Sequence, residues 1–245
     1  MATKAYYPIS EIGKGKTGFS KTRSIIEAAF YGNNVVKVNT LKEAYELAKN
    51  SPGTIVTDMP VYRGEEFGLE KDAKVLLFND GAITGRYATA RRIAGEPGVD
   101  CNALDIVAMD AVYESRWKTM YHAEVFVGLD PEFMVKAHLL LPEGEENIMY
   151  NWMLNFQYMS DEYVKMYKNS KPVGDGKEAD IYIFSDPQWT GSDRPNVSLD
   201  CLSDPQKKTL CYFNTETNCA CILGMRYFGE HKKETLTMAW AIANR

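Results

Sequence analysis

The sequence lacks the segments that would place the protein in a membrane or export it from the cell. No stretch of its 245 residues approaches the ~20 consecutive apolar residues of a membrane-spanning helix. The N-terminal segment does not resemble a signal peptide, because no apolar run follows the first residues. We therefore expect a cytoplasmic protein that has no membrane partner.

The chain also lacks an excess of positive charge. It has 28 lysine and arginine residues against 33 aspartate and glutamate residues, which gives a formal net charge of −5. A protein that binds nucleic acid through its overall field is usually basic. We therefore predict no nucleic-acid partner, and any site for an anion must be local.

Cysteine is scarce and shows no metal-binding spacing. The five cysteines are an odd number and include no C-x-x-C pair. A chain of this length, 45% hydrophobic, builds a core without disulfides. We therefore predict reduced thiols and no zinc motif. His122 and His138 fall in apolar strand-like runs, and we interpret them as core or surface histidines rather than as ligands.

A complete phosphate-binding loop is missing as well. Gly15-Lys16-Thr17 resembles the end of G-x-x-x-x-G-K-[ST], but Ser10 stands where the first glycine belongs. No hydrophobic strand precedes it to deliver backbone N–H groups around a phosphate. We interpret this segment as a basic N-terminal loop.

The remaining pattern predicts a mixed α/β domain, a mixed sheet with flanking helices that lacks the regular cadence of a doubly wound fold. Thr40 and Glu43 form a capping box that opens a helix over Leu41–Lys49. The segment Ala103–Val112 fits either a helix or a strand. Other helices are predicted over Ser24–Phe30, Asn147–Tyr167 with a break near Ser160, and Glu234–Ala243. Strands are predicted over Thr54–Thr57, Lys74–Phe78, His122–Val127, Phe133–Leu141, Asp180–Phe184, Thr209–Phe213 and Asn218–Met225, the last two as a hairpin.

One segment near the end of the chain is chemically unusual. Arg226-Tyr-Phe-Gly-Glu-His-Lys-Lys233 follows an apolar strand and precedes a predicted helix, with Gly229 expected to let the backbone turn. Two adjacent ammonium groups repel each other, and a chain usually accepts that cost where an anion or a metal binds. A second segment, Thr84-Gly85-Arg86, presents an arginine fork suited to a carboxylate or phosphate.

Three segments in this order give the chain a family resemblance. They are Thr84-Gly85-Arg86, Val127-Gly-Leu-Asp-Pro-Glu-Phe133 and Tyr227-Phe-Gly-Glu-His-Lys-Lys233. Together they resemble the N-terminal domain of phosphoenolpyruvate carboxykinase, chiefly the ATP-dependent type. Two departures stand out: Tyr87-Ala-Thr-Ala90 replaces the usual Ser-Pro-Lys-Asp, and His231 replaces a common methionine.

The resemblance implies roles for four residues. Arg86 would hold a carboxylate of oxaloacetate or phosphoenolpyruvate, Tyr227 would lie near the substrate and CO2, and Lys232 would contact substrate or phosphate. Lys233 would be a ligand of Mn2+, which requires the neutral amine. The implied reaction decarboxylates oxaloacetate to an enolate, which takes the γ-phosphoryl group of ATP or another donor, with Mn2+ and Mg2+ as cofactors.

The resemblance also implies what residues 1–245 would be. The family's phosphate-binding loop and its other metal ligands follow the third motif, so this chain would be a single substrate-binding N-terminal domain, inactive without a C-terminal nucleotide-binding domain. Two alternatives remain open. One is a non-catalytic dicarboxylate- or phosphate-binding module, and the other is an unrelated α/β domain in which the motifs are coincidental.

Overall fold

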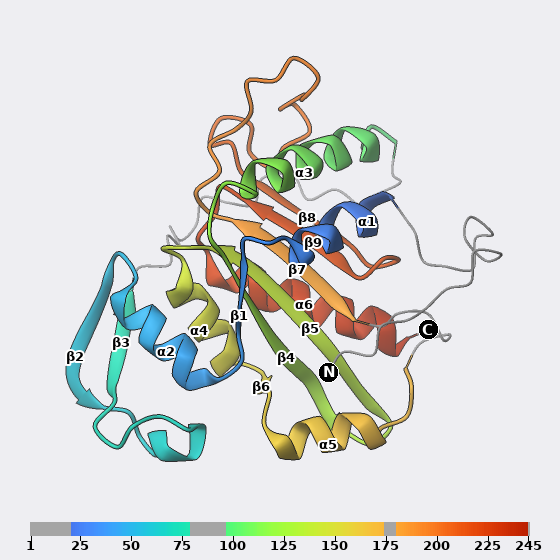
Figure 1. The fold of residues 1–245 in the computed structure, drawn as a ribbon. Coiled ribbons are helices and arrows are strands. Elements are labelled where there is room, and N and C mark those ends of the chain that lie inside the picture. The colour runs from blue at the N-terminus through green and yellow to red at the C-terminus, as the bar shows by residue number, and fades with distance from the viewer. Residues whose placement is uncertain (1–20, 79–96, 174–179, 245) are drawn as a thin grey trace.

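A seven-stranded mixed sheet organises the protein (Figure 1). The computed structural model describes residues 21–78, 97–173 and 180–244. The strands follow the order β1-β4-β5-β7-β9-β8, and the short β6 pairs with the same edge of β4 as β1 does. Their bounds are β1 Val35–Val38, β4 Met120–Asp130, β5 Phe133–Pro142, β6 Gln157–Tyr158, β7 Ile181–Asp186, β8 Leu210–Asn214 and β9 Cys219–Leu223.

Three neighbouring strands of the sheet run in the same direction. β5 pairs in parallel with β7, and β7 pairs in parallel with β9. Their carboxyl ends therefore meet at one edge of the sheet. β4 is antiparallel to β5 and β8 is antiparallel to β9, so these two strands begin at that same edge. The predicted mixed sheet is thereby confirmed.

Helices cover both faces of the sheet because the buried strands carry apolar side chains on both sides. Helices α2 (Leu41–Asn50), α4 (Glu146–Leu154) and α6 (Phe228–Ala243) pack on the face that includes Ala123 and Leu139. Helices α1 (Lys21–Ala28) and α3 (Cys101–Ser115) pack on the opposite face. Figure 1 shows α1 and α3 in front of the sheet and α6 behind it.

The remaining elements are short or lie beside this sheet. β2 (Thr54–Pro60) and β3 (Lys74–Phe78) form a separate antiparallel pair, and helix α5 (Asp161–Asn169) lies near the β4–β5 turn (Figure 1). Two 3-10 turns are Ala29–Tyr31 and Gly64–Phe67.

Local signals explain several helix boundaries. The predicted capping box is present, since the Thr40 hydroxyl accepts from the Glu43 amide and the Glu43 carboxylate accepts from the Thr40 amide. The ambiguous segment 103–112 is helical within α3, whose N-cap Asp100 accepts two backbone N–H groups. Ser160 caps α5, so the predicted helix 147–167 is two helices separated by β6.

The five cysteines are free thiols, as predicted. Cys219 and Cys221 alternate with Ala220 on β9 and are fully buried on the face covered by α1 and α3. Burial raises the pKa of the Cys219 thiol to about 12. These two side chains therefore act as small apolar groups of the core.

Candidate functional site

The segment Arg226–Lys233 of the predicted site lies where the parallel strands end. β9 ends at Leu223, and Gly224 has a φ of +64°, which turns the chain toward α6. A Cβ atom at Gly224 would lie 2.4 Å from the carbonyl oxygen of Lys208, so no other residue fits without moving backbone. The carboxyl ends of parallel strands are the usual place for ligands in open α/β sheets. The β9–α6 junction (residues 224–233) is therefore at a favourable edge.

Two ion pairs, each between a buried carboxylate and a cation, stabilise this edge. Asp186, at the end of β7 and 1% exposed, pairs with Lys118 at 2.6 Å. The Arg226 Nε atom lies 3.0 Å from an oxygen of Glu145, which immediately precedes α4. Burial raises the pKa of Glu145, and the nearby Arg226 opposes that shift. The ion pair ties the residue before Tyr227 to the neighbouring helix and so fixes the direction of the chain.

Tyr227 occupies the N-cap position of α6 and is 37% exposed. Its ring lies over Gly229, where an added Cβ atom would come within 2.4 Å of the ring carbon Cζ. Gly229 lies inside the first helical turn and its φ is not positive, so the expectation that it turns the backbone is wrong. Its role is to leave room for the tyrosine ring. Within residues 21–78, 97–173 and 180–244, the Tyr227 hydroxyl has no hydrogen-bond partner.

The lysine pair lies inside α6 rather than before it. The helix begins at Phe228, six residues before the predicted start at Glu234. Consecutive helical residues are about 100° apart around the axis, so the two ammonium groups diverge and their mutual repulsion is smaller than the sequence suggested. Lys232 donates to the Asn155 side chain at 2.9 Å, and Lys233 is exposed without a partner among the described residues.

His231 anchors this turn to the sheet. Its side chain is fully buried, with Nδ1 3.1 Å from the carbonyl oxygen of Tyr227 and Nε2 2.9 Å from the Ser185 hydroxyl of β7. A carbonyl only accepts, so Nδ1 carries the proton and the hydroxyl donates to Nε2. Burial lowers the pKa of His231 to about 4, which keeps the ring neutral. His231 therefore holds Tyr227 in place.

The structure describes only one of the other two motifs, and that motif does not join this junction. Arg86, with Thr84 and Gly85, lies outside the described residues. Gly128 has a φ of +86° and forms an irregularity near the end of β4, at the turn into β5. β5 begins at Phe133 and runs parallel to β7 and β9, so this turn lies at the opposite edge of the sheet from Tyr227. The motif Val127–Phe133 therefore shapes a hairpin and does not meet the lysine pair.

Two groups of described side chains have ligand atoms close enough to hold a metal ion. One is Cys211 with Glu230 and Glu234, where burial and the neighbouring carboxylates raise the pKa of the thiol well above its ordinary value. The other is His122 with Glu124 and His138, although the sequence favoured core or surface histidines over ligands at positions 122 and 138. The sequence does contain a pattern that indicates this group. His122 and Glu124 are two residues apart on one strand, and His138 follows on the next strand.

Comparison with profiles of known protein families and with curated proteins gave no match to this chain. Among the helices of the described residues, none combines the length and apolar character needed to cross a bilayer. The family resemblance therefore rests on the three motifs, and the structure adds the geometry of the third.

Proposed function

We propose that this chain is the oxyacid-binding domain of a phosphoenolpyruvate carboxykinase-like enzyme, with the β9–α6 junction as its binding surface. The observation that supports the proposal is the shared helix face of Tyr227 and Lys233. The Tyr227 ring covers Gly229, and Gly229 precedes Lys233 by one helical turn. Long helical side chains lean toward the N-terminus, which is the direction from Lys233 to the residue that the Tyr227 ring covers.

The chemistry of this surface suits an anionic substrate. Lys233 and the Tyr227 hydroxyl have no partner among the described residues, and the nearest helix end is the N-terminus of α6. The positive end of a helix dipole, an ammonium and a hydroxyl donor together favour a carboxylate or phosphate. Lys232 would exchange its neutral Asn155 partner for the substrate. In this proposal Tyr227 and Lys232 bind oxaloacetate or phosphoenolpyruvate, and Arg86 binds a carboxylate.

The proposed metal ligand is Lys233, whose exposed side chain would give up its proton to the solvent when the metal binds. One amine does not hold Mn2+, so the other ligands and the nucleotide site belong to a C-terminal domain of the same polypeptide in this proposal. A divalent metal, when bound, stabilises the negative charge of the enolate and of the transferred phosphoryl group. The enzyme would act in the cytoplasm, and this chain alone would not catalyse the reaction.

Calorimetric titration of the chain with phosphoenolpyruvate in the presence of Mn2+ tests the proposal. Lys232→Met removes a charged contact worth about 1.5–3 kcal/mol, so we expect at least about tenfold weaker binding. Tyr227→Phe should weaken binding less, because it removes one neutral hydrogen bond. Lys168→Met is the matched control, since it removes an exposed lysine from α5.

Two results would overturn the proposal. One is the absence of saturable binding at millimolar phosphoenolpyruvate. The other is equal affinity in Lys232→Met and Lys168→Met when both variants show the thermal unfolding of the parent chain.

A further inference from the structure

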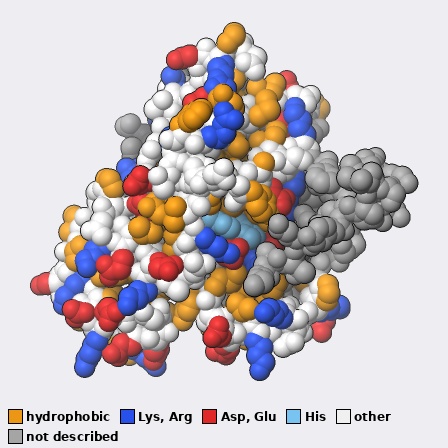
Figure 2. Space-filling model, in the orientation of Figure 1, with side chains coloured by type: hydrophobic (Ala, Val, Ile, Leu, Met, Phe, Trp, Pro, Cys, Tyr) orange, Lys and Arg blue, Asp and Glu red, His pale blue; other side chains and the backbone are white. Residues whose placement is uncertain are grey.

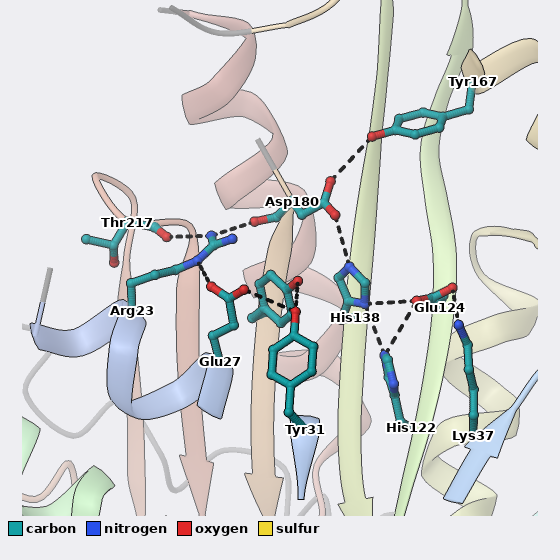
Figure 3. A network of polar contacts seen from close by, with 11 residues as sticks. Arg23, Glu27, Tyr31, Lys37, His122, Glu124, His138, Tyr167, Asp180 and Thr217 are labelled. Atoms are coloured by element: carbon teal, nitrogen blue, oxygen red, sulfur yellow. Dashed lines mark hydrogen bonds and ion pairs between the residues drawn. The ribbon is translucent and has the colours of Figure 1, made fainter. Parts of the chain in front are cut away.

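Three ligand-type side chains converge on the sheet face opposite α6. His122 and Glu124 point to the same side of β4, and the register places His138 of β5 directly opposite Glu124. The distance from His122 Nε2 to His138 Nδ1 is 3.0 Å, and Glu124 Oε1 lies 3.4 Å from His138 Nδ1 and 3.9 Å from His122 Nε2. Figure 3 shows the three side chains turned toward one another.

These distances bracket the spacing of ligands around a tetrahedral metal ion. Zinc binds imidazole nitrogen and carboxylate oxygen at about 2.0–2.2 Å, so tetrahedral ligand atoms are about 3.3–3.5 Å apart. The observed values of 3.0, 3.4 and 3.9 Å lie around that range. We propose that His122, Glu124 and His138 form a binding site for a divalent transition metal of the zinc class, with one coordination position left open.

A second group of residues orients His138 for this role. Its Nε2 atom lies 3.2 Å from Asp180, which in turn accepts from the Tyr167 hydroxyl at 3.4 Å (Figure 3). The Tyr182 ring stacks on the His138 ring with centroids 4.3 Å apart. A carboxylate on the far nitrogen of a metal-binding histidine fixes the ring and increases its basicity. Nδ1 of His138 is thereby directed at the other two ligand atoms.

The site is nearly buried but still reaches the surface. The exposed fractions are 9% for His122, 9% for Glu124 and 5% for His138. Figure 2 shows histidine atoms at the surface of this face, and they belong to this pair because His231 is fully buried. The edge of the Phe30 ring covers His122 at a centroid distance of 5.1 Å. Solvent or a small ligand can therefore complete the coordination, as in His2Glu zinc sites of catalytic type.

The charges around the site favour a metal that bonds strongly to nitrogen. Lys37 lies 3.0 Å from Glu124 Oε2, which leaves Oε1 for the metal, and Lys136 is a second nearby cation. The positive charge of these two lysines disfavours the binding of Ca2+ and Mg2+. Those ions bind mainly by charge and prefer oxygen ligands. Imidazole nitrogen binds Zn2+, Co2+ and similar ions by partly covalent bonds. The ligand set therefore selects the transition-metal class.

This site is independent of the proposed oxyacid surface. Its residues alternate with Ala123 and Leu139, which face the helices α2, α4 and α6, so it lies on the other side of the sheet from Lys233. Either site can therefore be disproved without the other.

Zinc titration of the unmodified chain, followed by NMR of the histidine rings, tests the proposal directly. We expect one Zn2+ per chain, with large 15N shifts at Nε2 of His122 and Nδ1 of His138 and none at His231. Replacement by Co2+ should give the visible absorption bands of a tetrahedral complex. No saturable binding at one equivalent, or binding that leaves the His122 and His138 nitrogens unshifted, would overturn the proposal whether or not any variant folds.

Variants then measure the contribution of each residue. His122→Ala and His138→Ala should each weaken zinc binding by more than about 100-fold, because loss of an outer partner alone usually costs 10–100-fold. Asp180→Asn should fall within that 10–100-fold range. Glu124→Gln is compared with Glu132→Gln, which removes an exposed carboxylate at the β4–β5 turn. Equal zinc affinity in these two glutamine variants would refute the assignment of Glu124.

Discussion

His231 should make the protein less stable in weak acid by an amount that a single substitution can isolate. The ring is fully buried between Ser185 and the Tyr227 carbonyl, and burial lowers its pKa from 6.5 to about 4. The unfolded chain takes up a proton near pH 6.5, whereas the folded chain does not until about pH 4. The contribution of the neutral ring to stability is therefore complete above pH 6.5 and is lost as the pH falls toward 4.

The size of this effect follows from the pKa difference. Each pKa unit is worth about 1.36 kcal/mol, so between pH 6.5 and pH 5 the loss is about 2 kcal/mol. His231→Gln keeps an acceptor for the Ser185 hydroxyl but does not titrate and loses the bond to the Tyr227 carbonyl. We expect the variant to be about 1 kcal/mol less stable at pH 8. At pH 5 that difference should reverse sign, because the parent loses about 2 kcal/mol and the variant does not.

Urea unfolding of both proteins at pH 8, 7, 6 and 5 is the assay. His122 and His138 titrate in both proteins, so their effects cancel in the comparison. The free-energy gap between parent and variant should change by about 2 kcal/mol across this range. A gap that stays constant within about 0.5 kcal/mol would show that His231 is not held neutral by burial, and the reasoning about the α6 anchor would be wrong.

Three further predictions concern alanine substitutions at two glycines and at one helix N-cap. Gly224→Ala should destabilise the protein by more than about 2 kcal/mol in chemical unfolding, because a φ of +64° and a backbone atom 2.4 Å away both oppose a side chain. Gly229→Ala meets only the end of the Tyr227 side chain, so its unfolding free energy should change by less than about 1 kcal/mol while phosphoenolpyruvate binding weakens. A Gly229→Ala variant with unchanged affinity would indicate that Tyr227 does not contact the ligand. Thr40→Ala should cost about 1 kcal/mol by removing the capping box of α2, and a melting temperature equal to that of the parent would contradict this.

The sequence predicted several strands close to their limits but missed β1 and β6, and it placed the start of α6 too late. Apolar runs such as Lys74–Phe78 and Phe133–Leu141 are bounded by turn residues, and each appears as a strand close to its predicted limits. The start of α6 was missed because its N-cap, Tyr227, makes no side-chain capping bond. What holds the first turn instead is His231 bonded to Ser185, 46 residues earlier in the chain. A local sequence pattern cannot predict a contact between residues so far apart in the chain.

The chain itself determines the class of its elements, its reduced thiols and the third motif at the end of a buried strand. Tertiary structure decided which side chains meet. The register of β4 against β5 places Glu124 opposite His138, and a slip of one residue would turn these groups to opposite faces. The same sheet order separates Gly128 from Tyr227 by the length of the parallel strands. Proximity between distant residues depends on strand order and register, which are set by the packing of the whole sheet and not by any single segment.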